Sequence, residues 1–164
     1  MKVFNLFLFL INIININALD KILSLNYLNK YRIIHCVPQL IYDKKIEAIA
    51  TEHAKYIIES GKFEHSSNSY GENIAYTYDV NDEFKAFVES TDLMYAEKKL
   101  YNYSKPGFSF YTGHFTQMVW KSSKYVGIGT FKNDTIIAIV VNYYPPGNVY
   151  NDFIENVTPS LECN

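Results

Sequence analysis

Residues 136–141 form a continuous apolar run, and this run limits the folds open to the chain more than any other stretch. A strand without polar alternation is typical of a sheet that is covered on both faces. Residues 125–131 also have the pattern of a strand, and residues 132–134 fit a turn. Strands at 125–131 and 135–144 therefore predict an antiparallel hairpin inside a layered domain.

The first part of the chain has helical periodicity instead. Asp20 and Asp43 stand where a side chain can cap a helix, and Gly61 stands where the second of these helices would end. A third helix is expected over about 81–101 and a short fourth one over 114–121. Helices followed by a hairpin predict an α+β fold. The expected inward face of the first helix consists of Ile22, Leu25, Leu28 and Ile33.

Composition limits the classes of function. The chain has 164 residues, a length that suits one domain with its own hydrophobic core. Its formal net charge is −2, so there is no basic excess to neutralise a phosphate backbone, and no nucleic-acid partner is expected. The chain has two cysteines, which close at most one bridge, so the fold is not a disulfide scaffold.

The N-terminus has the pattern of a secretory signal peptide. A positive charge at Lys2 precedes an apolar stretch over residues 3–16, and the small residue Ala18 stands at a cleavage position. A membrane anchor needs about 20 continuous apolar residues, whereas the longest uninterrupted run here is Leu6 to Ile11. We expect a signal peptide over 1–18, a single domain over 19–164 without a transmembrane segment, and secretion to the extracellular space.

Four motifs occur in a fixed order along the chain. They are Asn29-Lys30-Tyr31-Arg32, Gly71-Glu72-Asn73-Ile74-Ala75, the string Gly113 to Ser123 (GHFTQMVWKSS), and Tyr143 to Tyr150 (YYPPGNVY). Together they resemble the CAP superfamily, which contains cysteine-rich secretory proteins, venom antigen 5 proteins and plant pathogenesis-related proteins. The resemblance implies a three-layer α-β-α sandwich with a central antiparallel sheet.

The resemblance also implies a cleft in which two histidines and two glutamates converge. Mapped motif by motif, these are His65, Glu72, Glu97 and His114. Imidazole nitrogens and carboxylate oxygens both suit zinc, so the cleft is expected to be able to hold a divalent metal, with Zn²⁺ as the candidate. Their spacing alone predicts no metal site, since a solvated glutamate or a core histidine fits each position equally well.

Catalysis has weaker support than binding. A metal-dependent hydrolase or protease that uses the four cleft residues is one alternative, because a metal with open positions can activate water. A nucleophilic mechanism needs an activated nucleophile beside its base. Ser66 follows His65, but adjacency in sequence is weak support for a working pair. We expect no enzymatic activity and no catalytic residue.

The segment between Glu97 and His114 predicts a lipid site. Tyr101, Tyr103 and Phe108 have the spacing that resembles the caveolin-binding-type loop of sterol-binding CAP proteins. Aromatic faces on a Pro-Gly loop offer a flat apolar surface to a sterol ring. With 15 Tyr and 11 Phe in the chain, such spacing also arises easily by chance.

Three sequons fit a secretory route and mark Asn102, Asn133 and Asn156 as candidate glycosylation sites. Three is close to what chance gives in an Asn-rich chain, so their number is no evidence for glycosylation.

The cysteines depart from disulfide-rich CAP relatives. Ile128 and Val141 stand where many relatives have cysteines, which predicts hydrophobic packing in place of a bridge. Cys36 falls where disulfide-poor relatives often have a helix-ending glycine, so its backbone is expected to be strained. A Cys36–Cys163 bond would join the two ends of the mature chain, whereas free thiols or an intermolecular pair are the alternatives.

Taken together, these features predict a secreted CAP-domain binding protein whose ligand is an apolar lipid such as a sterol, or whose partner is an unidentified extracellular protein. The alternatives are the hydrolase described above and an immunomodulatory protein in which the cleft is vestigial.

Overall fold

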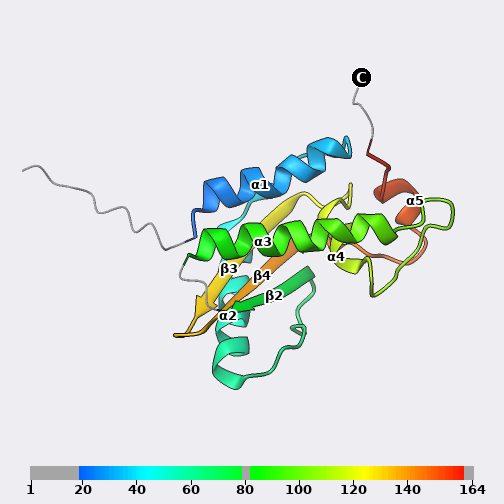
Figure 1. Ribbon diagram of the computed structural model, residues 1–164. Coiled ribbons are helices and arrows are strands. Elements are labelled where there is room, and N and C mark those ends of the chain that lie inside the picture. Colours follow the sequence, from blue (N-terminus) through cyan, green and yellow to red (C-terminus); the bar gives the residue numbers. More distant parts are fainter. Residues whose placement is uncertain (1–18, 79–81, 161–164) are drawn as a thin grey trace, which may run out of the picture.

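The described part of the chain folds as three layers, with a four-stranded sheet between helices (Figure 1). The structure is a computed structural model that describes residues 19–78 and 82–160. The predicted signal peptide over 1–18 lies outside the described residues. The layers confirm the expected α-β-α sandwich.

The sheet contains the predicted hairpin and two strands that were not expected. β3 (Tyr125–Lys132) and β4 (Ile136–Tyr144) pair antiparallel, and β4 pairs antiparallel with β2 (Gly71–Tyr78). β1 (Ile41–Tyr42) pairs in parallel with β3, so the strand order is β1-β3-β4-β2. The sheet is thus antiparallel except at β1, which is too short for its sequence to show a strand period.

Helices cover both faces of the sheet. α2 packs on β3 and β4 from one side, whereas α3 contacts β2 and β4 on the other side, together with α1 and α4 (Figure 1). The helical elements are α1 (Lys21–Ile34), α2 (Lys44–Ser60), α3 (Glu83–Ala96), the 3₁₀ turn η1 (Glu97–Leu100), α4 (Gly113–Met118) and α5 (Phe153–Asn156). The third predicted helix is therefore divided into α3 and η1, and the fourth ends three residues early.

Side-chain caps begin the long helices, as predicted. Asp20 accepts the backbone N–H groups of Ile22 and Leu23 at 3.0 and 2.9 Å, and Asp43 caps α2 in the same way. α2 ends at Gly61, whose φ of 69° lies in the left-handed region where glycine has no steric cost.

The predicted inward face of α1 is wrong at both ends. Ile22 and Ile33 are 73% and 52% exposed, while Asn29 and Arg32 are buried. Arg32 turns inward because its guanidinium donates to four backbone carbonyls, those of Pro38, Met118, Trp120 and Ser123, at 2.8 to 3.1 Å. A buried cation with this many acceptors joins α1 to the segment that connects α4 with β3.

Two glycines let α2 lie directly on β3. A Cβ added at Gly127 would come within 2.1 Å of the backbone nitrogen of Glu47, and one at Gly129 would come within 2.2 Å of that of Thr51. Both contacts are to helix backbone, which cannot rotate away. The glycines therefore set the distance between helix and sheet.

Two apolar clusters fill the layers on either side of the sheet. The larger lies under α1, α3 and α4, and the smaller lies under α2. Ile128 and Val141 are direct partners across β3 and β4 and are 1% and 3% exposed. Hydrophobic packing at these two positions is therefore confirmed. Among the described residues, no helix has the length and apolarity needed to cross a membrane.

Candidate functional site

The four predicted cleft residues come from four separate elements. His65 lies in the loop before β2, Glu72 is the second residue of β2, Glu97 begins η1, and His114 is the second residue of α4. The structure brings them together as two His–Glu pairs, His65 with Glu72 and His114 with Glu97.

The first pair closes the loop that precedes β2. His65 Nδ1 lies 2.9 Å from Glu72 Oε1, and the backbone N–H of Ser66 donates to the same oxygen at 2.9 Å. The Ser66 hydroxyl donates to the other oxygen, Oε2. The side chain of Glu72 is 5% exposed and that of His65 is 61% exposed. One buried carboxylate therefore holds a loop and orients an imidazole that faces solvent.

Hydrogen bonding shifts the pKa values of this pair in opposite directions. The hydrogen bond to Glu72 raises the pKa of His65 and outweighs burial, which acts in the opposite sense. Burial would raise the pKa of Glu72, but the hydrogen bonds from His65 and Ser66 together lower it. The protonated imidazole and the ionised carboxylate therefore coexist over a wider pH range than they would without the hydrogen bond.

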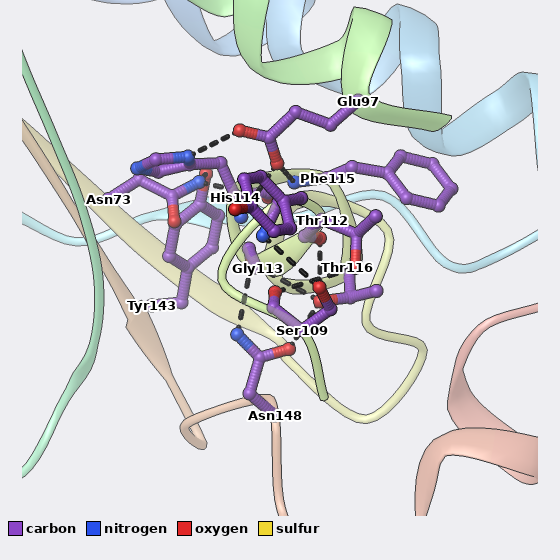
Figure 2. A network of polar contacts seen from close by, with 11 residues as sticks. Asn73, Glu97, Ser109, Thr112, Gly113, His114, Phe115, Thr116, Tyr143 and Asn148 are labelled. Atoms are coloured by element: carbon purple, nitrogen blue, oxygen red, sulfur yellow. Dashed lines mark hydrogen bonds and ion pairs between the residues drawn. The ribbon is translucent and has the colours of Figure 1, made fainter. Parts of the chain in front are cut away.

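The second pair lies at the N-terminus of α4 (Figure 2). His114 Nδ1 is 2.6 Å from Glu97 Oε1, and the backbone N–H groups of His114 and Phe115 donate to Oε2 at 3.1 Å each. Glu97 thus satisfies two free N–H groups of the helix start and orients the imidazole at the same time. Since η1 and α4 enclose residues 101–112, the contact closes that loop at its base.

Polar contacts from the sheet and the last loop hold His114 in place (Figure 2). The amide of Asn73 donates to the His114 carbonyl at 3.1 Å, and that of Asn148 donates to the Gly113 carbonyl at 3.0 Å. Asn148 also accepts a hydrogen bond from the hydroxyl of Thr116. The backbone of Asn148 is in the left-handed region, with φ of 58°. Sequence reasoning assigned no role to Asn148, although it stands inside the last motif.

The arrangement does not group four ligands around one ion. Among the described residues, no three His, Cys, Asp or Glu side chains lie close enough together to hold a metal. The carboxylates of Glu72 and Glu97 are already occupied by an imidazole and by backbone N–H groups. As placed, these residues do not fit a four-ligand zinc site.

The predicted aromatic loop lies partly in the core. Tyr101 is 9% exposed and its ring packs against Phe115, with centroids 5.8 Å apart. Tyr103 packs beside Tyr101, and its buried hydroxyl has no hydrogen-bond partner among the residues that the structure describes. Phe108 is 53% exposed. Of the three residues, Phe108 is therefore the one whose ring is exposed to solvent.

Two cavities meet at residues 106–108. A cavity of about 410 Å³ lies between this segment and the residues around α5, including Tyr150 and Ile154. A second cavity of about 290 Å³ lies on the loop side, lined by Tyr101 and Asn102 among others. Phe108 belongs to the wall of both.

Comparison with known proteins decides the family. The sequence model of the CAP family, described as the cysteine-rich secretory protein family, matches residues 25–144. The chain belongs to the CAP family.

Relatives and solved structures agree with this assignment. The human Golgi-associated plant pathogenesis-related protein 1 is 38% identical over 139 residues, which are 80% of this chain and 87% of the human protein. Protein PRY2 of Saccharomyces cerevisiae is 36% identical over 73% of this chain, which spans 35% of the yeast protein.

Two structures show the same fold at lower identity. Schistosoma mansoni venom allergen-like protein 4 has a TM-score of 0.66 at 22% identity, over 87% of this chain and 98% of that one. NaASP2, crystallised with Zn²⁺, has a TM-score of 0.67 at 22% identity, over 84% of each chain.

The three candidate glycosylation sites differ within this CAP domain. Asn156 is 5% exposed, and its amide donates to the Asp152 carbonyl and accepts the N–H of Ser122, both at 2.9 Å. A glycan there would break both bonds. Asn102 and Asn133 are exposed.

Cys36 follows the end of α1 with φ of 53°, so the expected backbone strain is confirmed. Its predicted partner, Cys163, lies outside the described residues, and the bond stays a prediction.

His53 is a further residue near the first pair. It lies on α2 and is 9% exposed. Its Nε2 bonds the Glu64 carbonyl at 2.9 Å and lies 4.0 Å from Glu72 Oε1. No local sequence pattern predicts this contact, because it depends on the packing of α2 on β4, the strand that pairs with β2.

Proposed function

We propose that this CAP protein is secreted and binds an apolar lipid, such as a sterol, without chemical turnover. The observation that carries the proposal is the pair of cavities that share Phe108 as a wall. Their volumes of about 410 and 290 Å³ are on the scale of small-molecule sites.

The surroundings of the cavities favour an apolar ligand. Tyr150 and Ile154, at the rim of the larger cavity, are 85% and 73% exposed. Exposed apolar side chains gathered at a hollow are typical of a ligand site or an interaction surface. A sterol would cover them at a gain of about 25 cal/mol for each Å² removed from water.

The first His–Glu pair favours binding over hydrolysis. A serine nucleophile needs a base that accepts its proton, but the Ser66 hydroxyl and the His65 imidazole both donate to Glu72 instead of to each other. The same carboxylate also anchors the backbone of the loop. The pair therefore has a structural task that competes with catalysis.

Secretion is supported by the N-terminal pattern and by relatives. Met1 to Ala18 has the order of charge, apolar stretch and small residue of a signal peptide. A relative that is 36% identical over 74% of this chain is the secreted protein RBT4 of Candida albicans. The human relative is named as Golgi-associated and not as secreted, so the support from relatives comes from the Candida albicans protein.

Zinc bound by the two histidines alone is a separate proposal, since the four cleft residues do not form one four-ligand site. Each glutamate holds the Nδ1 atom of its histidine, an orientation that is common for metal-binding histidines, and Nε2 is the atom left for a ligand. Native mass spectrometry with and without chelator tests this. A bound ion that is lost from both His65→Ala and His114→Ala would support it, and an unchanged mass in the presence of zinc would contradict it.

The lipid proposal is tested by cholesterol binding to the secreted protein. Phe108→Ser removes a wall of both cavities and is expected to weaken binding at least tenfold, in line with the value of burying one Phe side chain. Tyr111→Ser is the matched control, since Tyr111 is 77% exposed and lines neither cavity. Equal affinity of the two variants, or no binding by the wild type, would contradict the proposal.

Asn102 gives a second test, because it lies in the wall of the smaller cavity and inside a sequon. A glycan at Asn102 is expected to hinder lipid entry, so Asn102→Gln should bind cholesterol better than the glycosylated wild type. The other functions predict different results. A hydrolase would show chelator-sensitive cleavage that is lost in His114→Ala, and a protein with a vestigial cleft would show neither cleavage nor lipid binding.

A further inference from the structure

A groove on the α2 side of the sheet plays no part in lipid binding as proposed above. Its volume is about 190 Å³, and it lies where the end of α2, strand β2 and the β3–β4 turn meet. Its lining includes Ile58, Phe63, Tyr76, Tyr78, Asn133 and Ile136.

Three aromatic side chains form one wall of this groove. Phe63, Tyr76 and Tyr78 are 48%, 42% and 64% exposed. The ring centroids of Phe63 and Tyr76 are 4.7 Å apart and those of Tyr76 and Tyr78 are 5.3 Å apart, with interplanar angles of 87° in both cases. Contiguous exposed aromatic side chains on a small domain indicate a surface that is covered by something else. Aromatic faces are the common seat for the C–H face of a sugar ring.

The residue at the rim of the groove is itself a sugar acceptor by sequence. Asn133 begins the sequon Asn133-Asp134-Thr135 and lies in the turn between β3 and β4. Its Oδ1 accepts the N–H groups of Thr135 and Ile136 at 3.0 and 2.9 Å, and the Thr135 hydroxyl at 3.3 Å. Within the described residues its Nδ2 has no hydrogen-bond partner, so the nitrogen that a glycan would use is available.

We infer that Asn133 carries an N-linked glycan and that the aromatic groove seats its innermost N-acetylglucosamine. The inference rests on the secretory part of the proposed function. In that route, Asn133 Nδ2 attacks C1 of a lipid diphosphate-linked oligosaccharide. The N–C1 bond forms as the C1–O bond breaks, the lipid diphosphate leaves, and Nδ2 loses a proton.

The chain's own glycan fits the groove better than a free ligand does. Because Asn133 lines the groove, the first sugar is placed there by its covalent bond at a high effective concentration. The groove has room for about one sugar ring, which matches the innermost residue and not an extended chain. Asn156 offers no comparable site, since its amide is buried and hydrogen-bonded.

The first test is occupancy in the full chain expressed with its own N-terminus in a eukaryotic secretory host. Glycopeptide mass spectrometry is expected to find a glycan at Asn133 and none at Asn156. A glycan at Asn102 with a bare Asn133 would overturn the inference while leaving the secretory route intact. A chain that is secreted into the medium but bare at Asn133 would overturn the inference alone, whereas a chain that stays inside the cell with its N-terminal segment uncleaved would overturn the secretory route and the inference with it.

The second test asks whether the first sugar lies in the groove. Trimming the glycan to a single N-acetylglucosamine is expected to leave the Tm unchanged, whereas Thr135→Ala, which prevents glycosylation, is expected to lower it by about 2–4 °C. The wild type and Thr135→Ala are also both made in bacteria, where neither carries a glycan. This pair controls for the lost Thr135 hydroxyl, and the two Tm values are expected to differ little. Equal losses in both hosts would overturn the groove as a seat.

A spectroscopic readout separates seating from simple attachment. The N-acetyl methyl resonance of the trimmed sugar is expected to move upfield, because it lies over aromatic rings. Tyr78→Ser should reverse this shift, whereas Phe110→Ser, an exposed aromatic outside the groove, should not. A methyl resonance at its free-sugar position in the wild type would overturn the inference.

Discussion

At the residue scale, two carboxylates perform the same task for two different loops. Glu72 and Glu97 each accept one hydrogen bond from an imidazole Nδ1 and at least one from a backbone N–H. Sequence motifs identified all four partners but predicted a single converging cleft. The pairing was not predictable, because it depends on where the loop before β2 and the start of α4 lie in space.

The first prediction concerns the titration of His65. NMR is expected to find its pKa above 6.5, and Glu72→Gln should lower it, because the hydrogen bond to Glu72 raises it. His35 is the internal reference, since burial lowers its pKa. A His65 pKa at or below 6.5 in the wild type would contradict the prediction.

The same pair gives stability a defined pH dependence. The pKa of His65 is raised, so its contribution is complete below 6.5 and is lost as the pH rises through the raised value. The pKa of Glu72 is lowered, so its contribution is complete above 4.5 and is lost as the pH falls through the lowered value. Urea unfolding should therefore show the largest cost of Glu72→Gln between about pH 4.5 and 6.5.

The second prediction concerns Arg32, which is fully buried and stays charged, although burial lowers its pKa to about 10. Arg32→Met leaves buried carbonyls without donors, each at a cost of about 1–3 kcal/mol. We expect the free energy of unfolding to fall by about 3 kcal/mol or more in urea titrations. Arg32→Lys should restore the free energy of unfolding only in part, because an ammonium lacks the planar, forked set of N–H donors of a guanidinium. Full rescue by lysine would argue against the fork as the cause.

At the element scale, close approach and burial decide what each segment does. α2 lies directly on β3 at Gly127 and Gly129, and the loop at 101–112 is closed at its base by Glu97 and His114. The pattern Gly-Ile-Gly was visible in the sequence as part of a strand. Its role in helix packing was not, because it depends on which element covers that face.

The third prediction tests the helix–sheet contact. Gly129→Ala would place Cβ within 2.2 Å of the Thr51 backbone, so α2 has to move, and we expect a loss of about 1–3 kcal/mol or more. Gly107→Ala is the matched control, since nothing lies within 4 Å of a Cβ at that position. Thermal unfolding of the two variants measures the difference, and equal Tm values would contradict the packing argument.

The fourth prediction concerns the aromatic loop. Tyr103→Phe removes a buried hydroxyl that has no partner in the described part of the chain, so the free energy of unfolding is expected to stay level or rise by about 1 kcal/mol. The opposite result, a clear loss of stability in thermal unfolding, would show that the hydroxyl has a partner in solution. Tyr27→Phe is the contrasting variant, because the Tyr27 hydroxyl donates to Asp92 at 2.7 Å and its loss should destabilise.

At the scale of the whole molecule, packing carries the fold. The larger apolar cluster contains Ile128 and Val141, and the smaller one joins α2 to the sheet. This agrees with a chain of 48% hydrophobic residues and two cysteines. A bridge between Cys36 and Cys163 would add to a core that is complete without it.

The fifth prediction follows from this arrangement. Mass spectrometry after alkylation is expected to find no free thiol in the secreted protein, and two alkylated thiols would reject the Cys36–Cys163 bond. A reductant should lower the Tm without unfolding the domain at room temperature, because a bond closing a loop this long contributes at most about 5 kcal/mol. Loss of near-UV circular dichroism on reduction would instead show that the bridge carries the fold.

The sequence by itself determined the hairpin, the caps at Asp20 and Asp43 and the family, because local periodicity, capping side chains and contiguous motifs are all written in neighbouring residues. Tertiary structure alone decided which glutamate each histidine pairs with and which asparagines are open to a sugar. It also decided that Arg32 faces inward while Ile22 and Ile33 face solvent. Each of these outcomes depends on backbone carbonyls, amides or helix faces from segments far away in the chain, which no local pattern encodes.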